Sequence, residues 1–477
     1  MASDSEIRNP HSALPAPHSA FRIPEFPENL RGKRVIVLGA GRSGRAAAAL
    51  LARHDAQITL VDDYATNLDP QQFDDIVASH VQIVLGDVRP ELASSAEAVV
   101  ISPGVRLNHP LVARARELGL PLIGELELGS RYARAPVVAV TGTNGKTTTV
   151  HWIAHLLSKT GRRVAVCGNV GTALCEVVNQ TPDWFVVEVS SYQLETIERF
   201  HPRVAVILNL TPDHLERHPT ADIYLAAKAR ITMNQKANDV LVLNADDGAV
   251  WSVAAKTAAT VWGFSTSRLM DLGAFVTDGR IAVCDASDST IRSLLLTRDL
   301  SLPGSHNLAN ALAAAAAAWN CGVEPDAIAA GLRDFPGVEH RIERVRERRG
   351  VRFVNDSKAT NLASLEVALL GFDCPIILIA GGRGKGAPYE PLAPLIVSRV
   401  RRLIVLGEDA ERMERAWGPH VATQRAADMA EAVERATQEA RPGEVVLLSP
   451  ACASFDMYRN FEERGRHFKD IVMRLEE

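Results

Sequence analysis

The chain has few of the residues that mark several common protein classes. Only 6 of its 477 residues are cysteines, and none stands in a Cys-x-x-Cys pair, which argues against a zinc site or a redox motif. No apolar run is long enough to cross a membrane, and no signal-peptide pattern opens the sequence. The net charge of −5 gives no support for a nucleic-acid partner. We therefore expect a cytoplasmic protein with reduced thiols and with no nucleic-acid or membrane partner. We also expect it to be a monomer.

What remains is an ordinary globular composition in a long chain. Hydrophobic residues make up 47% and charged residues 23%, as in typical soluble domains. A chain of 477 residues is too long for one hydrophobic core, so several domains are expected. Residues 1–31 are rich in proline, serine and histidine and read as a disordered tail. We predict domains over 32–124, 125–337 and 338–477.

The most informative segment is Thr141-Gly-Thr-Asn-Gly-Lys-Thr147, which follows an apolar run. Its two glycines let backbone N–H groups converge on phosphate oxygens. Lys146 brings a positive charge to the terminal phosphates, and the Thr147 hydroxyl can bind Mg²⁺. The helix expected from Thr148 points its positive end at the same place. Because Val140 stands where the strict pattern has glycine, the segment is predicted to be a shortened P-loop.

A second glycine-rich turn lies near the start of the chain. Gly39-Ala-Gly-Arg-Ser-Gly44 follows an apolar strand at 34–38 and precedes a helical pattern, and a second strand at 57–61 runs into Asp62. Glycines at this spacing, with an acidic residue about 20 positions on, form the dinucleotide-binding fingerprint of a βαβ unit. Taken alone, this pattern suggests NAD.

Strands and helices alternate along the rest of the chain. The pattern predicts an α/β fold of three domains, each a mainly parallel sheet with flanking helices. The first and third domains are expected to be Rossmann-like, and the central one to resemble a P-loop ATPase. Residues 262–302 turn often and are predicted to add short antiparallel strands to the central sheet. Further strands are expected at 81–85, 98–101, 120–123, 136–140, 164–166, 184–189, 204–209, 240–244, 352–355, 375–380, 402–406 and 444–448.

Candidate metal ligands lie at the ends of two strands of the central domain. Glu188 ends one strand and His214 follows another, so a carboxylate and an imidazole can converge on one cation. Taken singly, each is more often a polar residue that faces solvent. Lys228 lies in a helical pattern, where a lysine is usually a solvated charge.

Taken together and in this order, the segments resemble the Mur ligase family. These are ATP-dependent amide ligases that extend the peptide of the peptidoglycan precursor in cell-wall synthesis. The resemblance runs from about residue 32 to the end. The matching segments are the P-loop, Val187-Glu-Val-Ser-Ser-Tyr-Gln-Leu-Glu195, Asn209-Leu-Thr-Pro-Asp-His-Leu-Glu-Arg217, Tyr224-Leu-Ala-Ala-Lys228, Ser305-His-Asn-Leu-Ala-Asn310, Glu339-His-Arg341 and Asn355-Asp-Ser-Lys-Ala-Thr-Asn361.

Two segments resemble the branch of the family that adds D-glutamate. They are Asn355–Asn361 and Leu448-Ser-Pro-Ala-Cys-Ala-Ser-Phe-Asp456. The resemblance implies ATP-dependent addition of D-glutamate to UDP-N-acetylmuramoyl-L-alanine through an acyl phosphate. Phosphoryl transfer of this kind depends mainly on positioning and on neutralised charge.

The resemblance also implies roles for individual residues. Catalysis would rest on Lys146, Lys228, His214 and Arg341. ATP would be bound by Gly142, Thr143, Asn144, Gly145, Lys146, Thr147, Thr148, Asn307, Asn310, Arg341, Asp356 and Lys358. Two Mg²⁺ ions would be held by Thr147, Glu188, His214 and a carbamylated Lys228. D-Glutamate would meet Thr360, Lys385, Ser454 and Phe461.

In this family the Gly39–Gly44 turn binds the pyrophosphate of UDP, by the same backbone chemistry that would hold NAD. The UDP substrate would contact Gly41, Arg42, Ser43, Asp63, Tyr64, Asn169 and Ser190. At the uridine, this chain departs from well-known members: Asp63-Tyr64 stands in place of a Thr-Arg pair.

Other functions stay open on the sequence alone. Another Mur-type ligase, or a folate polyglutamate ligase, would share the P-loop, but folate enzymes lack the Gly39–Gly44 domain. An NAD-dependent oxidoreductase would leave the P-loop without a role. A P-loop motor or transporter ATPase would leave Asp356–Lys358 and Ser449–Asp456 unexplained. ADP release that requires both a nucleotide-sugar substrate and an amino acid would separate a ligase from the last two.

Overall fold

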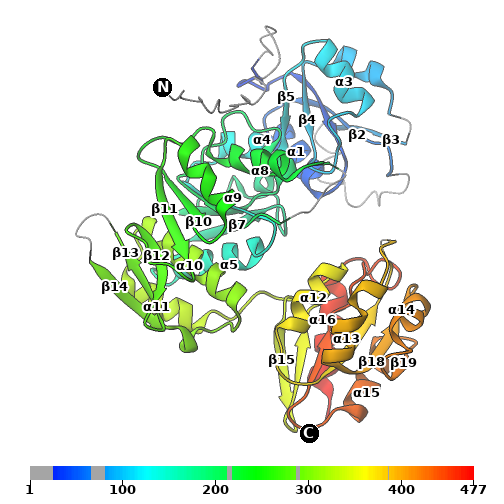
Figure 1. Ribbon diagram of the computed structural model, residues 1–477. Helices are drawn as coiled ribbons and strands as arrows, with labels where there is room; N and C mark the ends of the chain where they lie inside the picture. Colours follow the sequence, from blue (N-terminus) through cyan, green and yellow to red (C-terminus); the bar gives the residue numbers. More distant parts are fainter. Residues whose placement is uncertain are drawn as a thin grey trace, which may run out of the picture. The chain divides into compact units, whose positions relative to one another are not determined.

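The computed structural model describes residues 25–65, 81–86, 88–211, 217–285, 290–384 and 386–476, and they form three β-sheets with flanking helices (Figure 1). The three-domain α/β fold class predicted from the sequence is confirmed. No helix within these ranges is both long enough and apolar enough to cross a lipid bilayer.

The N-terminal sheet has the strand order β3-β2-β1-β4-β5, and all its strands are parallel. β1 is buried after its first residue, which explains its unbroken run of valine, isoleucine and leucine. The strands are β1 (Arg34–Leu38), β2 (Gln57–Asp62), β3 (Val81–Leu85), β4 (Ala98–Ile101) and β5 (Leu122–Gly124), and the helices are α1 (Arg42–Ala52), η2 (Pro90–Ser95), α3 (Pro110–Glu117) and α4 (Glu125–Tyr132).

The central sheet has the order β14-β13-β12-β11-β10-β9-β6-β8-β7. Its strands are β6 (Val137–Thr141), β7 (Val164–Gly168), β8 (Trp184–Glu188), β9 (Val204–Ile207), β10 (Val240–Asn244), β11 (Thr260–Ser265), β12 (Gly273–Thr277), β13 (Arg280–Cys284) and β14 (Ile291–Leu296). The helices are α5 (Lys146–Ser158), α6 (Leu174–Val177), α7 (Ser191–Leu194), α8 (Ala221–Ala229), η3 (Arg230–Thr232), α9 (Gly248–Trp251), η4 (Ser252–Lys256), η5 (Thr297–Asp299), α10 (Ser305–Asn320) and α11 (Pro325–Asp334).

The alanine-rich helix α10 forms much of the central core. All residues from Ala311 to Ala318 are buried, and the helix packs on α5 and on the sheet. Small side chains let the helix approach its neighbours closely, which explains why alanine fills this stretch. Trp152 of α5 stacks on Phe335 in the same core, with ring centroids 4.7 Å apart.

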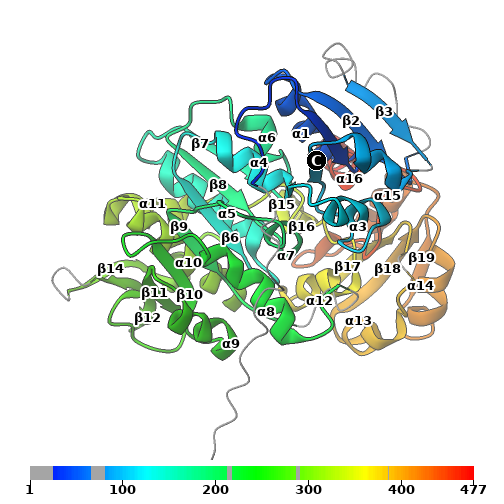
Figure 2. The ribbon, with the colours of Figure 1, turned by 90° about the horizontal axis from the view of Figure 1, so that it is seen from above.

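The C-terminal sheet has the order β15-β16-β20-β17-β18-β19. Figure 2 shows α13 beside β18 in this sheet. The strands are β15 (Glu343–Arg348), β16 (Val351–Asn355), β17 (Ile376–Gly381), β18 (Val400–Leu406), β19 (Thr423–Arg425) and β20 (Val445–Leu448). The helices are α12 (Leu362–Leu370), η6 (Glu390–Leu392), α13 (Ala393–Arg399), α14 (Ala410–Trp417), α15 (Met429–Glu439) and α16 (Phe461–Arg474).

The appended part of the central sheet differs from its prediction in two strands, β11 and β12, which continue the parallel sheet. β13 and β14 are antiparallel to their neighbours, as expected, but β11 runs parallel to both β10 and β12. The reason is the connection between β10 and β11, where α9 and η4 form a crossover that returns the chain to the same end of the sheet.

The described chain divides into two compact units whose borders cut across the sequence. The first unit takes in the chain up to Arg134, together with Cys167–Thr181 and Ser190–Phe200. The second holds Ala135–Val166, Pro182–Val189 and the chain from His201 onward. The segments that follow β7 and β8 therefore belong with the N-terminal sheet. The domain boundaries predicted at 32–124, 125–337 and 338–477 stay predictions.

Gly44 is predicted to be essential for packing α1 on β1. A Cβ atom on Gly44 would lie 1.7 Å from the Gly39 carbonyl oxygen, so Gly44→Ala should destabilise the first unit by about 1–3 kcal/mol. Gly41→Ala is the matched control, because a Cβ atom there meets nothing within 4 Å. Hydrogen exchange of the β1 amides measures the difference, and equal protection in the two variants would contradict this account of the packing.

Candidate active site

The shortened P-loop joins β6 to α5 in a conformation that requires its glycines. Gly142 has a φ of 149° and Gly145 a φ of 84°, which residues with side chains rarely adopt. A Cβ atom on Gly145 would lie 2.3 Å from Oδ1 of Asn310, so the loop packs directly against α10. α5 begins at Lys146, and its N-terminus carries the partial positive charge that favours an anion.

The Lys146 side chain lies over its own loop. Its Nζ donates to the carbonyl oxygens of Gly142 and Thr143, at 2.9 and 2.8 Å. Both acceptors are neutral, and a charged phosphate oxygen forms a stronger hydrogen bond with an ammonium group. The Lys146 ammonium group is therefore held at the loop, where an anionic ligand can bind it.

Thr147 lies at the centre of a buried polar cluster. Its hydroxyl donates to Oε2 of Glu188 at 2.7 Å and accepts from Nζ of Lys358 at 3.1 Å. Burial, helped by the positive charges of Arg341 and Lys146 and opposed by Glu188, lowers the pKa of Lys358 to about 8. A hydroxyl and a carboxylate that already meet are oxygen ligands of the kind that Mg²⁺ takes.

Lys228 is buried, whereas a lysine in a helix is usually solvated. Only 1% of it is exposed; its Nζ donates to the Gly142 carbonyl at 2.8 Å and lies 4.2 Å from the centre of the Tyr224 ring. The structure therefore brings Lys228 to the P-loop. His214, the other residue predicted for the second cation, lies outside the described residues.

The predicted adenine and phosphate ligands Asn307 and Asn310 both lie on α10. Asn310 is buried against Gly145, as the P-loop geometry requires. The Asn307 side chain donates to the Pro303 carbonyl at 2.7 Å, which fixes it at the first turn of the helix. The structure thus brings Asn310 to the P-loop, whereas Asn307 is held by the chain that leads into α10.

Asp356, predicted to bind ribose, is buried and doubly engaged. It accepts from the Ser449 hydroxyl at 2.8 Å and from the backbone N–H of Ile342 at 3.2 Å. Burial raises its pKa to about 7, opposed by the Ser449 hydrogen bond and by the positive charge of Arg341. Asp356 therefore joins β16 to the loop after β20 and to the chain around Arg341.

The residues predicted for D-glutamate lie on three segments of the C-terminal domain. Thr360 follows β16, Ser454 follows β20 and is buried, and Phe461 begins α16. The Phe461 carbonyl accepts from the Ser357 hydroxyl at 2.8 Å, so the first and third segments are in contact. Lys385 lies outside the described residues.

Arg464 joins these segments, and the sequence reasoning missed it. Its guanidinium donates to the Ser357 hydroxyl and carbonyl, at 3.0 and 2.8 Å, and to the Cys452 carbonyl at 3.1 Å. A signal was present, because Arg464 stands within the apolar stripe of α16 where a hydrophobic residue is expected. The buried residues of that helix are Arg464, Gly465, Phe468 and Val472.

The glycine-rich turn of the first unit is held by Asp62. Its Oδ2 accepts from the Ala40 N–H at 2.7 Å, and its Oδ1 accepts from the N–H groups of Tyr64 and Ala65. In the dinucleotide fingerprint, the acid at this place accepts the ribose hydroxyls. Because both oxygens of Asp62 already bind the backbone, this geometry does not favour the NAD alternative.

All seven residues predicted for the UDP substrate belong to the first unit. Arg42, at the start of α1, donates to the Gly171 carbonyl and so ties the turn that contains Asn169 to this helix. Ser190 caps α7, where its hydroxyl accepts from the Gln193 N–H at 3.2 Å. The residues predicted for ATP and for D-glutamate all belong to the second unit.

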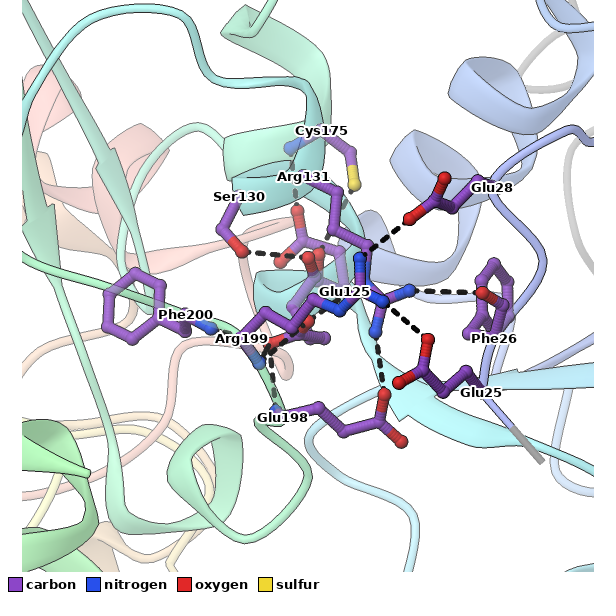
Figure 3. A network of polar contacts seen from close by, with 11 residues as sticks. Glu25, Phe26, Glu28, Glu125, Ser130, Arg131, Cys175, Glu198, Arg199 and Phe200 are labelled. Carbon is purple, nitrogen blue, oxygen red and sulfur yellow. Dashed lines mark hydrogen bonds and ion pairs between the residues drawn. The ribbon is translucent and has the colours of Figure 1, made fainter. Parts of the chain in front are cut away.

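Two glutamates of α4 anchor these distant segments within the first unit (Figure 3). Glu127 is fully buried and accepts from the backbone N–H groups of Glu198, Arg199 and Phe200, and from Nε of Arg131. The segment after Ser190 is thus fixed to α4. No local sequence signal indicates this, because the partners lie about 70 positions apart.

Glu125, two residues earlier, is bound far less completely. Its Oε1 accepts from the Cys175 N–H at 2.8 Å, but its buried Oε2 has no hydrogen-bond partner within the described part of the chain. Burial raises the pKa of Glu125 to about 7. The site therefore favours the protonated, neutral form of the Glu125 carboxyl group.

Comparison with known proteins agrees with this arrangement. Residues 33–124, 140–318 and 340–452 match, in order, the Mur ligase MurD-like N-terminal domain, the Mur ligase middle domain and the Mur ligase glutamate ligase domain. MurF ligase from Thermotoga maritima, solved in complex with ADP, has the same fold, with a TM-score of 0.57 at 18% identity over 88% of this chain and 96% of that one.

The chain belongs to the Mur ligase family. Two relatives are named UDP-N-acetylmuramoylalanine–D-glutamate ligase. The one from Acidobacterium capsulatum is 41% identical over 446 residues, 93% of this chain and 97% of that protein. The one from Pelotomaculum thermopropionicum is 44% identical over 449 residues, 93% and 98% of the two chains. The family resemblance seen in the sequence is confirmed, and the protein is a ligase.

Removing the charge of Glu125 and removing that of Glu127 are predicted to have opposite effects on the stability of the folded protein. Ionisation of Glu125 destabilises the folded state increasingly from its ordinary pKa near 4.5 up to about 7, a total of about 3 kcal/mol. Glu125→Gln should therefore match the wild type near pH 5 and exceed its thermal midpoint at pH 8. Glu127→Gln should lower the midpoint at both pH values, since it weakens hydrogen bonds to a charged acceptor. A Glu125→Gln variant without any gain at pH 8 would contradict this reading.

Proposed function

We propose that the protein joins D-glutamate to UDP-N-acetylmuramoyl-L-alanine at the expense of ATP, as a monomer in the cytoplasm. Two observations support this: the names of relatives that match nearly the whole chain, and the buried meeting of the P-loop Thr147 with Glu188 and Lys358. The carboxylate of the alanyl group attacks the γ-phosphorus of ATP and releases ADP. The D-glutamate amine then attacks the acyl phosphate carbon, forms the amide and expels phosphate.

The P-loop residues neutralise the charge that moves in the first step. The Lys146 ammonium shifts from its loop carbonyls to the phosphate oxygens, and the N-terminus of α5 points its backbone N–H groups to the same oxygens. Lys358, in contact with Thr147, supplies further positive charge, and Arg341 lies near enough to Lys358 to lower its pKa. Because these positively charged groups are already beside the phosphates when phosphoryl transfer begins, they need to move little to stabilise the transition state.

The described oxygen ligands fit one magnesium ion, which Thr147 and Glu188 would hold. When bound, Mg²⁺ screens the charges of the terminal phosphates. Lys228, buried beside Gly142, would serve a second ion only as a carbamate, because an ammonium group cannot coordinate a cation. A carbamate keeps one N–H for the Gly142 carbonyl and presents carboxylate oxygens to the metal. His214 would complete this second site.

The C-terminal segments suit an amino acid with two carboxylates. The Ser454 and Thr360 hydroxyls are donors, and Lys385 would add a positive charge. Arg464 does not contact substrate in this proposal. It fixes Ser357 and Cys452, and so sets the spacing between the two loops that bear these donors.

ADP release is predicted to depend on UDP-N-acetylmuramoyl-L-alanine and D-glutamate together. Diamino acids should be ineffective, because the donors after β16 and β20 suit a second carboxylate and not an amine. L-Glutamate should be ineffective because its inverted Cα would turn the amine away from the acyl phosphate when both carboxylates are bound. A coupled assay of ADP with each amino acid in turn measures this. Comparable turnover with a diamino acid would overturn the assignment, and ADP release without any amino acid would point to an ATPase.

Lys228→Ala is predicted to be nearly inactive and to regain part of its activity with millimolar formate or acetate. A small carboxylate can fill the vacated space and supply the oxygen ligand that the carbamate would provide. Lys146→Ala is the matched control: it should also be inactive, but a carboxylate cannot replace a lost cation. Equal rescue of both variants, or of neither with the folds intact, would argue against the carbamate.

A further inference from the structure

A short segment ahead of β1, residues 25–28, lies on the first unit and has no role in the proposal above (Figure 3). It forms neither helix nor strand. Its Phe26 is nonetheless only 1% exposed, whereas the side chains of Glu25 and Glu28 are each 79% exposed. A buried aromatic ring between two solvated acids is typical of a segment anchored by one side chain. Residues 25–28 are called the strap.

Arg131 of α4 holds both the backbone and the ring of Phe26. Its Nη1 donates to the Phe26 carbonyl at 3.3 Å, and its guanidinium carbon lies 5.5 Å from the centre of the Phe26 ring. Other nitrogens of the same group donate to Oε1 of Glu127 at 2.8 Å and to Oε2 of Glu198 at 2.6 Å. A planar guanidinium can bind several acceptors in fixed directions. Arg131 therefore joins the strap, α4 and the chain around Glu198.

Arg199 binds the charged side chains of the strap. Its Nη1 donates to Oε1 of Glu28 at 2.9 Å, and its Nη2 donates to Oε2 of Glu25 at 2.6 Å. The backbone N–H of Arg199 donates to the two oxygens of Glu127, at 3.1 and 3.0 Å. The stretch Ser190–Phe200 is thus held both by the buried acid of α4 and by the strap.

The chain that follows the strap fixes it to the N-terminal sheet. Leu30 is buried, and its carbonyl accepts from the backbone N–H of Lys33 at 2.9 Å. The Gly32 N–H donates to the carbonyl of Asp55, just before β2, at 2.8 Å. The strap therefore has one end fixed beside β1 and β2 and the other bonded to Arg131 and Arg199.

We propose that the strap keeps the stretch Ser190–Phe200 in place on α4, and that this placement sets the affinity for the UDP substrate. The inference rests on the proposed function, because Ser190 is a residue predicted to bind that substrate. The short helix α7 connects Ser190 to the residues that α4 and the strap hold, so loosening at Arg199 also frees Ser190. Phe26 and Arg199 are positioning residues, and neither contacts the substrate in this proposal.

Hydrogen exchange of the full chain tests the strap directly. The backbone amides of residues 198–200 all donate to Glu127. In Phe26→Ala, which removes the buried anchor, these amides should exchange at least about tenfold faster than in the wild type, because only α4 then protects them. Arg199→Glu should accelerate them less, by about threefold, since the ion pairs that it breaks are exposed and screened by salt.

Reversed charges show whether the strap acts through its contacts. Arg199→Glu combined with Glu25→Arg and Glu28→Arg should return the exchange rates to within about twofold of the wild type, because the ion pairs re-form with opposite signs. Arg114→Glu is the matched control. It breaks an exposed ion pair on α3 of the same unit and should leave these amides unchanged.

Steady-state kinetics test the link to the substrate. In Phe26→Ala, the KM for UDP-N-acetylmuramoyl-L-alanine should rise at least about fivefold, while kcat and the KM for ATP stay within about twofold of the wild type. The residues predicted for ATP belong to the second unit, which the strap does not contact. A merely structural role would instead reduce the fraction of folded enzyme and so lower kcat.

The outcomes separate this inference from the proposed function. Unchanged exchange of residues 198–200 in Phe26→Ala would overturn the strap. Faster exchange with an unchanged KM for the UDP substrate would overturn its link to that substrate, and so would a loss of kcat alone. A wild type without ligase activity would overturn the proposed function and the substrate link together, whereas hydrogen exchange alone decides whether the strap holds Ser190–Phe200.

Discussion

Every candidate site in this molecule depends on one constraint: parallel strands in a sheet present their carboxyl ends at a common edge. β6 and β8 are neighbours, so the loop after β6 brings Thr147 to Glu188 although 41 positions separate them. β1 and β2 are neighbours in the N-terminal sheet, which brings the glycine-rich turn to Asp62 and Asp63. The hydrophobic strands thus determine which polar residues can meet, before any ligand binds.

Carboxylates that bind the backbone hold these segments in place. The half-buried Asp62 and the buried Glu127 each accept several backbone N–H groups. Such acids resemble catalytic residues in a sequence, but their oxygens are already occupied. Glu125 differs, since its buried Oε2 has no hydrogen-bond partner among the residues that the structure describes. Position next to a motif therefore says less about an acid than the bonds that it already makes.

Much of the fold could be predicted from the sequence, because buried parallel strands appear there as apolar runs and turns that contain glycine mark where the strands end. β15 was missed: its sequence Glu343-Arg-Val-Arg-Glu-Arg348 is almost wholly charged, since it is an edge strand paired on one side only. At the candidate site, Thr147 and Glu188 were found from strand ends and family motifs. Arg464 and Glu127 were not, because their partners lie far along the chain, and the burial of Lys228 depends on packing that no local pattern encodes.

The first unit is assembled from three separate stretches of chain, the last of which ends at Phe200. On the ribosome, a nascent chain that has emerged only as far as α4 cannot yet complete this unit, because the N–H donors for Glu127 have not been synthesised. At a translation rate of roughly 5–20 residues per second, the Glu127 carboxylate lacks these N–H donors for several seconds after α4 has been made. The P-loop and strands β6 to β8 are translated in that interval, so the first unit is completed only after part of the second has been made. The N-terminal domain therefore cannot be cut out at its sheet boundary without losing its own anchors.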